Sequence, residues 1–318
     1  MKIHADLWRA FEQAESSGFG LCCFTEPQRR AIQRRLRCGE VMSPARGVYV
    51  RTVQWSSLTY EQKGDCVIKT LAKLHPQWIL SGSCAAWLYG VTRTFRLLSQ
   101  VMVAVPPRSH SYTPAGIVQS YLDDSEKSDL RLRGVRVCSI ERTLFDCART
   151  LPLEESLGIC DQAVRKRWVS SPRLADFLDE HRGFRGVESA RLAFSLIDPL
   201  SENGGESKAR ALMYELGFAL PQLQVAFNDP VTHRRYRADF MWTLPNGIQI
   251  VGEFDGRQKY VDEGMRNGLT VEQVLEKEKA RESRLSIYDV RLLRFGYAEL
   301  MNPAYFKKLL TEFGVPRR

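Results

Sequence analysis

Long apolar runs are missing from this chain of 318 residues. No stretch approaches the roughly 18 uncharged residues that a membrane helix needs. The N-terminal segment MKIHADLWRAFEQAE carries charges where a secretion signal would be apolar. We therefore expect a cytoplasmic protein without a membrane partner.

Histidine is scarce as well, with five residues, and the eight cysteines are scattered without any CxxC spacing. A zinc ribbon and a disulfide framework both need regular cysteine spacing, so neither is supported. We interpret the cysteines as reduced side chains that mostly fill the core as small hydrophobic residues.

The length and composition predict more than one folded domain. The chain exceeds the roughly 100–200 residues of an ordinary domain, and 44% of its residues are hydrophobic, which is enough for folded cores. The residue patterns change near positions 51 and 200, and Ser201–Gly205 has the composition of a linker. We predict a multi-domain α/β (α+β) protein with domains at 1–51, 52–200 and 201–318.

Positive charge is present in excess, and it is concentrated. The 46 lysines and arginines exceed the 37 acidic residues by nine, which favours a polyanionic partner such as nucleic acid. Residues 28–51 contain seven arginines against a single acidic residue, Glu40. Most of the excess therefore lies in 24 residues.

This basic segment has the pattern of a helix followed by a hairpin. Thr25–Gln28 has the pattern of a capping box, the helix is expected to end near Cys38, and a hairpin is predicted over 41–50. A helix, an arginine-rich helix and a hairpin form the order of a winged helix, whose helix enters the major groove of double-stranded DNA. The alternative is a solvated basic face without a partner. The predicted DNA-binding residues are Arg29, Arg30, Arg34, Arg35, Arg37 and Arg46.

The middle segment, 52–200, shows no cofactor motif and no repeat. It reads as a mixed α/β unit, with a strand and helix over 78–91 and a further strand over 134–140. Ser81, Ser83 and Cys84 are possible nucleophiles, but no histidine stands in a recognisable partner motif. Capping or packing roles are therefore favoured for them.

The last third predicts the element order αβββαβα and a group of carboxylates. Glu253 and Asp255 share one face at the end of a strand, about 7 Å apart. Asp239, on the neighbouring strand, can reach the same place. Like charges are costly together unless a cation compensates, and carboxylate oxygens suit Mg²⁺ or Mn²⁺. Such an ion beside a lysine, with Lys259 the first candidate, is suited to phosphodiester hydrolysis.

This constellation resembles the PD-(D/E)XK restriction-endonuclease-like fold, in particular its very-short-patch-repair (Vsr-like) branch. The resemblance is carried by Glu206, by Asp239 in RADF, by Glu253 and Asp255 in GEFDG, and by Arg294 in LLRF. It implies a metal-dependent deoxyribonuclease with metal ligands Asp239 and Glu253 and the catalytic set Glu206, Asp239, Glu253, Asp255 and Lys259.

One residue departs from that family's pattern. Asp255 stands where the motif usually has lysine, so activity would need a migrated lysine, either Lys259 or Lys279. The alternative is an ion-pair network in a fold without catalysis, in which the carboxylates pair with Arg237, Lys259 and Arg294.

Over most of its length the chain also resembles AbiEi-type antitoxins of type IV toxin–antitoxin systems. The resemblance is carried by LRCGEVMSPARGVYV, WILSGSCAAWLYGV, VRVCSIERTLFDCAR and GEFDGRQKY, in that order. It implies a DNA-binding N-terminal domain that regulates its own operon, a middle antitoxin domain, and a nucleotidyltransferase-like toxin as partner.

Three interpretations follow from the sequence. The chain is a DNA-binding regulator or antitoxin, a metal-dependent endonuclease that its winged helix targets to DNA, or a protein-binding antitoxin whose DNA contacts are secondary.

Overall fold

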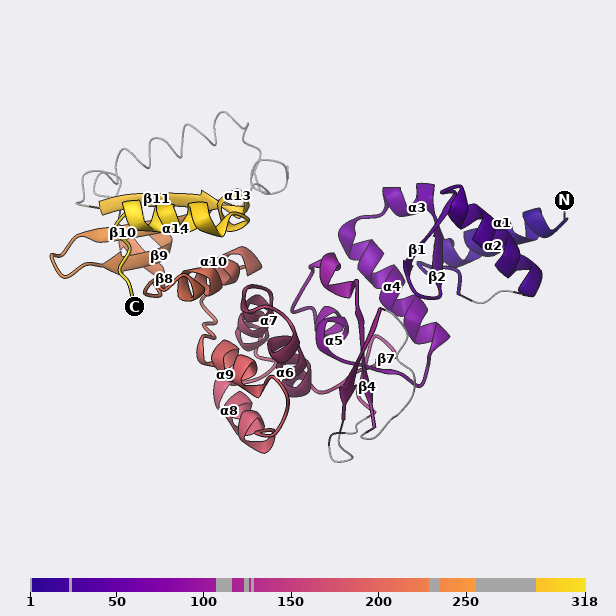
Figure 1. The fold of residues 1–318 in the computed structure, drawn as a ribbon, viewed down its shortest axis with the longest axis horizontal. Coiled ribbons are helices and arrows are strands. Elements are labelled where there is room, and N and C mark those ends of the chain that lie inside the picture. Colours follow the sequence, from indigo (N-terminus) through magenta and orange to yellow (C-terminus); the bar gives the residue numbers. More distant parts are fainter. Residues whose placement is uncertain are drawn as a thin grey trace. The chain divides into compact units, whose positions relative to one another are not determined.

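The computed structural model forms two compact units, each discontinuous in sequence (Figure 1). Unit 1 contains Met1–Thr150 and Pro172–Arg191, and unit 2 contains Leu151–Ser171 and Leu192–Arg318. Their mixture of helices and sheets confirms the predicted multi-domain α/β class. The division into three domains stays a prediction. The residues that the structure describes are 2–22, 25–106, 116–122, 126, 129–228, 235–255 and 290–318.

Unit 1 begins with the predicted helices and hairpin: α1 (Lys2–Ser16), α2 (Glu26–Arg37), β1 (Val41–Ala45) and β2 (Val48–Arg51). The predicted capping box is present, because Thr25 and Gln28 each accept the other's backbone N–H. After α2 the chain turns at Gly39, whose φ of 75° lies in the region that favours glycine. The core of this part is formed by Leu7, Phe11, Leu21, Ala31, Ile32 and Val41.

The remainder of unit 1 packs helices around a small sheet of order β3-β4-β5, in which β4 runs antiparallel to β3 and parallel to β5. Its elements are α3 (Thr52–Ser57), α4 (Tyr60–Leu74), β3 (Ile79–Leu80), α5 (Gly82–Tyr89), η1 (Phe95–Leu98), β4 (Val101–Val105), β5 (Ile117–Tyr121), β6 (Arg131–Leu132), β7 (Val135–Arg136), α6 (Ile140–Thr150) and α8 (Ser171–Glu180), with α9 (Val187–Ser195) at the boundary.

One predicted strand of this part is largely wrong. The alternation over 134–140 predicted a long strand, but β7 covers only Val135–Arg136. Val137 then forms a single bridge to Leu80, and the Ser139 hydroxyl accepts the backbone N–H of Arg142 at 3.2 Å. The helix-starting contact at Ser139 ends the extended conformation early.

Unit 2 contains a sheet of order β11-β10-β9-β8, in which β10 and β11 are parallel and the other neighbours are antiparallel. Figure 1 shows α14 running along this sheet. The described elements follow the predicted order, while the helix predicted around 271–286 lies outside the described residues. The described elements of unit 2 are α7 (Leu153–Arg165), which precedes the predicted set, and α10 (Gly204–Glu215), β8 (Gln222–Asn228), β9 (Arg235–Thr243), β10 (Gln249–Asp255), β11 (Val290–Gly296), α13 (Tyr297–Leu300) and α14 (Pro303–Glu312).

The terminal helix predicted over 298–313 is instead two helices. The side chain of Asn302 accepts the backbone N–H of Tyr305 at 3.1 Å and caps a new helix whose first turn contains Pro303. A proline lacks the N–H that a continuing helix would use, so α13 ends before it.

Buried ion pairs join α7 to α10 within unit 2. Arg210 donates from Nη1 to Asp161 Oδ2 at 2.9 Å, and Lys208 Nζ lies 3.1 Å from Glu154 Oε1. Burial raises the pKa of Asp161 to about 6, although Arg210 opposes this shift. These contacts hold α10, the helix that carries Glu206, against α7. No helix in the described part of the chain is both long and apolar enough to cross a bilayer.

Candidate functional sites

The outer face of α2 presents arginine side chains to solvent. Arg30, Arg34 and Arg37 lie at three- and four-residue spacing on one face and are exposed, with Arg29 beside them. Glu26 is the acidic residue at the start of this helix, and its carboxylate lies 3.2 Å from Arg29 Nε. Arg46 is exposed at the turn of the β1–β2 hairpin. Five of the six predicted DNA-binding arginines are therefore exposed to solvent.

The sixth, Arg35, is placed differently, and its inclusion in the exposed set is wrong. Only 7% of its surface is accessible, its Nη1 donates to Ala31 O at 3.1 Å, and its guanidinium lies 5.2 Å from the ring centre of Trp8. Arg35 follows the buried Ala31 and Ile32 by four and three residues, so it shares their inward face. This arginine stabilises the contact between α2 and α1.

Arg51, the last of the seven arginines, joins the hairpin to α1. Its Nη2 lies 2.6 Å from Glu15 Oε2, and its backbone N–H donates to Glu15 Oε1 at 3.1 Å. Two arginines of the basic segment, Arg35 and Arg51, therefore join α2 and the hairpin to α1, and the other five are exposed.

In unit 2, the predicted carboxylates come from α10, β9 and β10. Glu253 and Asp255 are partly exposed and Phe254 between them is buried, as the predicted alternation requires. Asp239 Oδ2 accepts the backbone N–H of Phe254 at 2.9 Å. Asp239 therefore lies beside the end of β10 that carries the other two carboxylates.

Glu206 joins this group from the first turn of α10. It is only 2% exposed, and its Oε2 accepts the backbone N–H of Glu202 at 2.7 Å and the side-chain amide of Gln224 at 3.1 Å. Burial raises its pKa to about 7, and the neighbouring negative charge of Asp239 adds to the shift. We call Glu206, Asp239, Glu253 and Asp255 the carboxylate cluster.

Two of the cationic residues that were expected to pair with the carboxylates, Arg294 and Arg237, lie in the described part of the chain, and only Arg294 contacts the cluster. Arg294 Nη2 lies 3.4 Å from Glu253 Oε2, as the ion-pair alternative expected. Arg237 instead pairs with Glu202, with 2.5 Å between Nη2 and Oε1. Lys259 and Lys279 lie outside the described residues. Within the described ranges, no three Asp, Glu, His or Cys side chains form a group that could hold a metal ion.

Gln224 is a site residue that the sequence reasoning missed. Its φ of 53° lies in the left-handed region, although it stands inside β8 and is not glycine. The pairs Leu223–Phe240 and Val225–Ala238 place it opposite Asp239. Strained backbone of this kind is found preferentially at functional sites. No sequence signal marks the residue, because a glutamine between apolar strand positions is ordinary.

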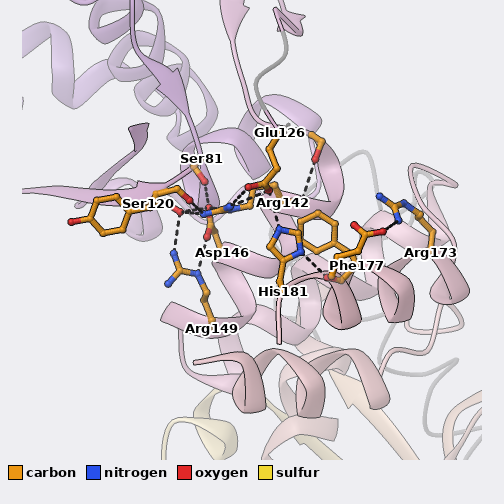
Figure 2. A network of polar contacts seen from close by, with 12 residues as sticks. Ser81, Ser120, Glu126, Arg142, Asp146, Arg149, Arg173, Phe177 and His181 are labelled. Atoms are coloured by element: carbon orange, nitrogen blue, oxygen red, sulfur yellow. Dashed lines mark hydrogen bonds and ion pairs between the residues drawn. The ribbon is translucent and has the colours of Figure 1, made fainter. Parts of the chain in front are cut away.

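A second polar group that the sequence reasoning missed lies inside unit 1 (Figure 2). Asp146 is fully buried and accepts hydrogen bonds from Ser81, from Ser120 at 2.7 Å and from Arg142 Nε at 3.1 Å. Arg149 Nε also donates to it, at 2.8 Å. We call these residues, together with Glu126 and His181, the Asp146 network.

The network extends to α8 through Glu126. Arg142 Nη1 lies 2.8 Å from Glu126 Oε2, and His181 Nε2 lies 3.3 Å from Glu126 Oε1 (Figure 2). The other ring nitrogen, Nδ1, contacts Phe177 O at 2.7 Å. The available signal was the pair Arg142 and Asp146, spaced i, i+4 among apolar residues of α6.

The possible nucleophiles of the middle segment are buried in this region. Ser81 donates its hydroxyl hydrogen to Asp146, and Ser83 is buried in the first turn of α5. Burial raises the pKa of the Cys84 thiol to about 11, which keeps it neutral at physiological pH. These placements agree with the expected packing roles.

Comparison with known proteins finds relatives that match part of the chain. Two uncharacterized proteins of Mycobacterium tuberculosis, from strains CDC 1551 and H37Rv, are each 31% identical to this chain over 100 residues. The match covers 31% of this chain, and the chain spans only about a third (36%) of the length of these relatives. No family model matches the sequence.

Proposed function

We propose that this protein binds double-stranded DNA through α2 and the β1–β2 hairpin, as a transcriptional regulator or antitoxin. The observation that carries the proposal is the exposed face of Arg30, Arg34 and Arg37, with Arg29 and Arg46 beside it. Planar guanidinium groups bind both phosphate oxygens and guanine edges. The opposite face of α2 is buried, so the helix has one face available for a groove.

The test is binding to a labelled duplex from the region upstream of the protein's own gene, measured by fluorescence anisotropy. We expect Arg30→Ala with Arg34→Ala to weaken binding at least tenfold, because each removes a contact to phosphate or base. Affinity should also fall steeply with salt as condensed ions are released. Arg9→Ala, an exposed arginine on α1, is the matched control. Binding that ignores salt, or equal losses in both variants, would contradict the proposal.

The antitoxin role adds a partner. The order of the sequence motifs supports a nucleotidyltransferase-like toxin, encoded next to this gene, as the protein that the chain neutralises. Co-expression with the product of the adjacent gene is the test. We expect a complex that survives size-exclusion chromatography, and rescue of growth when both proteins are made together.

A second candidate function is Mg²⁺- or Mn²⁺-dependent DNA cleavage by unit 2. The observation that favours it is the carboxylate cluster, in which Glu206 and Asp239 are neighbours despite their like charges. Asp239 and Glu253 would hold the ion, which would activate water and stabilise the phosphorane charge. The catalytic lysine would be Lys259.

Nicking of supercoiled plasmid with Mg²⁺ or Mn²⁺ tests this second function. The expected outcome is nicking by the wild type that disappears in Glu253→Gln, while Glu312→Gln on α14 cleaves normally. A wild-type protein that is inactive with both ions would contradict it. Direct Mn²⁺ binding, measured by electron paramagnetic resonance, separates loss of metal from loss of chemistry.

A further inference from the structure

We propose a second DNA-contacting surface, on unit 2, made by four consecutive residues at the end of α7 together with Arg237. The four are Arg165, Lys166, Arg167 and Trp168, and we call them the α7 tip. The identity of the partner, DNA, rests on the proposed function. The surface itself is independent of α2, because it belongs to the other unit.

The backbone of the α7 tip is held in a defined turn. Arg167 N–H donates to Val164 O at 2.9 Å, and Trp168 N–H donates to Ala163 O at 3.0 Å. This pair of bonds is the Schellman ending of a helix, which places the residue after the cap in the left-handed region. Arg167 occupies that position with a φ of 59°.

Glycine is the usual residue at that position, because a side chain there is strained. Arginine at the position costs stability relative to glycine, and its side chain is exposed. The turn directs a cation outward at the end of a rigid helix.

The side chains of the α7 tip have the chemistry of a nucleic-acid contact. Arg165, Lys166 and Arg167 are exposed, and 46% of the surface of Trp168 is accessible. The sequence has no acidic residue between Asp161 and Asp176. Three cations beside an exposed aromatic ring match a phosphate backbone with a sugar or base stacked next to it.

Glu202 connects the α7 tip to the carboxylate cluster. Its Oε1 lies 4.0 Å from Arg165 Nη2 and 2.5 Å from Arg237 Nη2, so it stands between two guanidinium groups. Its backbone N–H donates to Glu206 at 2.7 Å. A DNA phosphate could replace the Glu202 carboxylate between these arginines, since both are oxyanions. DNA bound there would continue from the α7 tip to the carboxylate cluster.

The first experiment compares full-length proteins in two backgrounds, wild type and Arg30→Ala/Arg34→Ala. The double variant Lys166→Ala/Arg167→Ala is tested against Lys307→Ala/Lys308→Ala, an exposed pair on α14 with the same charge change. The probe is a 30-base-pair duplex, followed by anisotropy from 50 to 200 mM salt.

We expect the α7-tip variant to weaken binding about tenfold and to reduce the slope of log K against log salt by about 2, because two phosphate contacts are lost. In the α2 background, we expect it to remove the remaining binding. No difference from the Lys307/Lys308 control in either background would overturn the inference. Intact binding in the α2 variant alone would instead contradict the proposed function.

A second experiment separates the surface from folding. We expect Arg167→Gly to raise the melting temperature by roughly 2–4 °C through relief of the left-handed strain, and at the same time to weaken DNA binding. Trp168→Ala should weaken binding and Trp168→Phe should restore it, because stacking needs only an aromatic face. Trp168→Ala and Arg167→Gly variants that bind the duplex as tightly as the wild type would overturn the assignment to DNA.

Discussion

Both units bury charged side chains, but they balance the charge differently. In the Asp146 network, Asp146 receives bonds from two arginines, and Arg142 also faces Glu126. In the carboxylate cluster, Glu206 receives bonds from a backbone N–H and the side-chain amides of Gln224 and Asn203, and its charged neighbours are Asp239 and Glu202. The first group is matched internally and serves the fold. In the second, the like charges of Asp239 and Glu202 add to the burial that raises the pKa of Glu206.

The largest expected effect comes from removing Asp146 from the Asp146 network. Asp146→Ala leaves Arg142 buried without its main partner, and we expect the free energy of unfolding to fall by about 3–5 kcal/mol. Urea denaturation followed by circular dichroism measures this change. Asp129→Ala, which removes an exposed carboxylate beside Arg136, should cost less than about 1 kcal/mol. Equal costs would show that the Asp146 network does not stabilise unit 1.

Neutralising Glu206 should change the stability in the opposite direction. The pKa of Glu206 is raised to about 7, above its ordinary value of 4.5, so the unfolding free energy falls as pH rises from 4.5 through 7. Glu206→Gln removes that cost, and we expect it to stabilise the protein by roughly 1–3 kcal/mol at pH 8. At pH 4.5 the gain should largely vanish. Denaturation curves at the two pH values, with Glu312→Gln as control, test the sign.

The arginines of α2 allow the same comparison within one helix. Arg35→Ala should lower the unfolding free energy by roughly 1–2 kcal/mol, because its buried guanidinium lies over the Trp8 ring and donates to Ala31 O. Arg34→Ala should change it by less than about 0.5 kcal/mol and should weaken DNA binding instead. Thermal melts of both variants measure the change in stability, and anisotropy measures the change in DNA binding. A large stability loss in Arg34→Ala would contradict the division into bonded and exposed arginines.

The smallest effect concerns the carboxylate that stands between Arg165 and Arg237. We expect Glu202→Gln to strengthen DNA binding about two- to fivefold, because exposed ion pairs are weak and two guanidinium groups gain access to phosphate. Glu188→Gln, an exposed glutamate on α9, should leave affinity unchanged. Weaker binding by Glu202→Gln would show that Glu202 supports the site rather than competing for it.

Local patterns predicted the elements well where the turn or capping residues and the spacing of apolar side chains indicated the same boundaries. The strand predicted over 235–243 matches β9, because alternating side chains end at a Pro-Asn-Gly turn. The capping box at Thr25 was also confirmed. Competing local contacts explain the failures: Ser139 shortened a strand, and Asn302 with Pro303 divided a helix.

The candidate sites were predictable only in part. The position of Glu253 and Asp255 on one face of a strand followed from strand geometry. The inclusion of Glu206 in the site came from the family resemblance. The Asp146 network joins Ser81, Ser120 and Glu126, which are far apart in sequence, so no local pattern could show that they meet. The backbone of Gln224 and of Arg167 was equally invisible, because the residue type does not reveal a left-handed φ.

The segment Pro172–Arg191 belongs to unit 1, although the chain on both sides of it belongs to unit 2. Its Phe177 and His181 pack on Phe145 of α6. A protein that ends at residue 150 would therefore lose Phe177 and His181 from the core of unit 1 and expose Phe145. Each unit is discontinuous in sequence, so no single cut of the chain separates the two units intact.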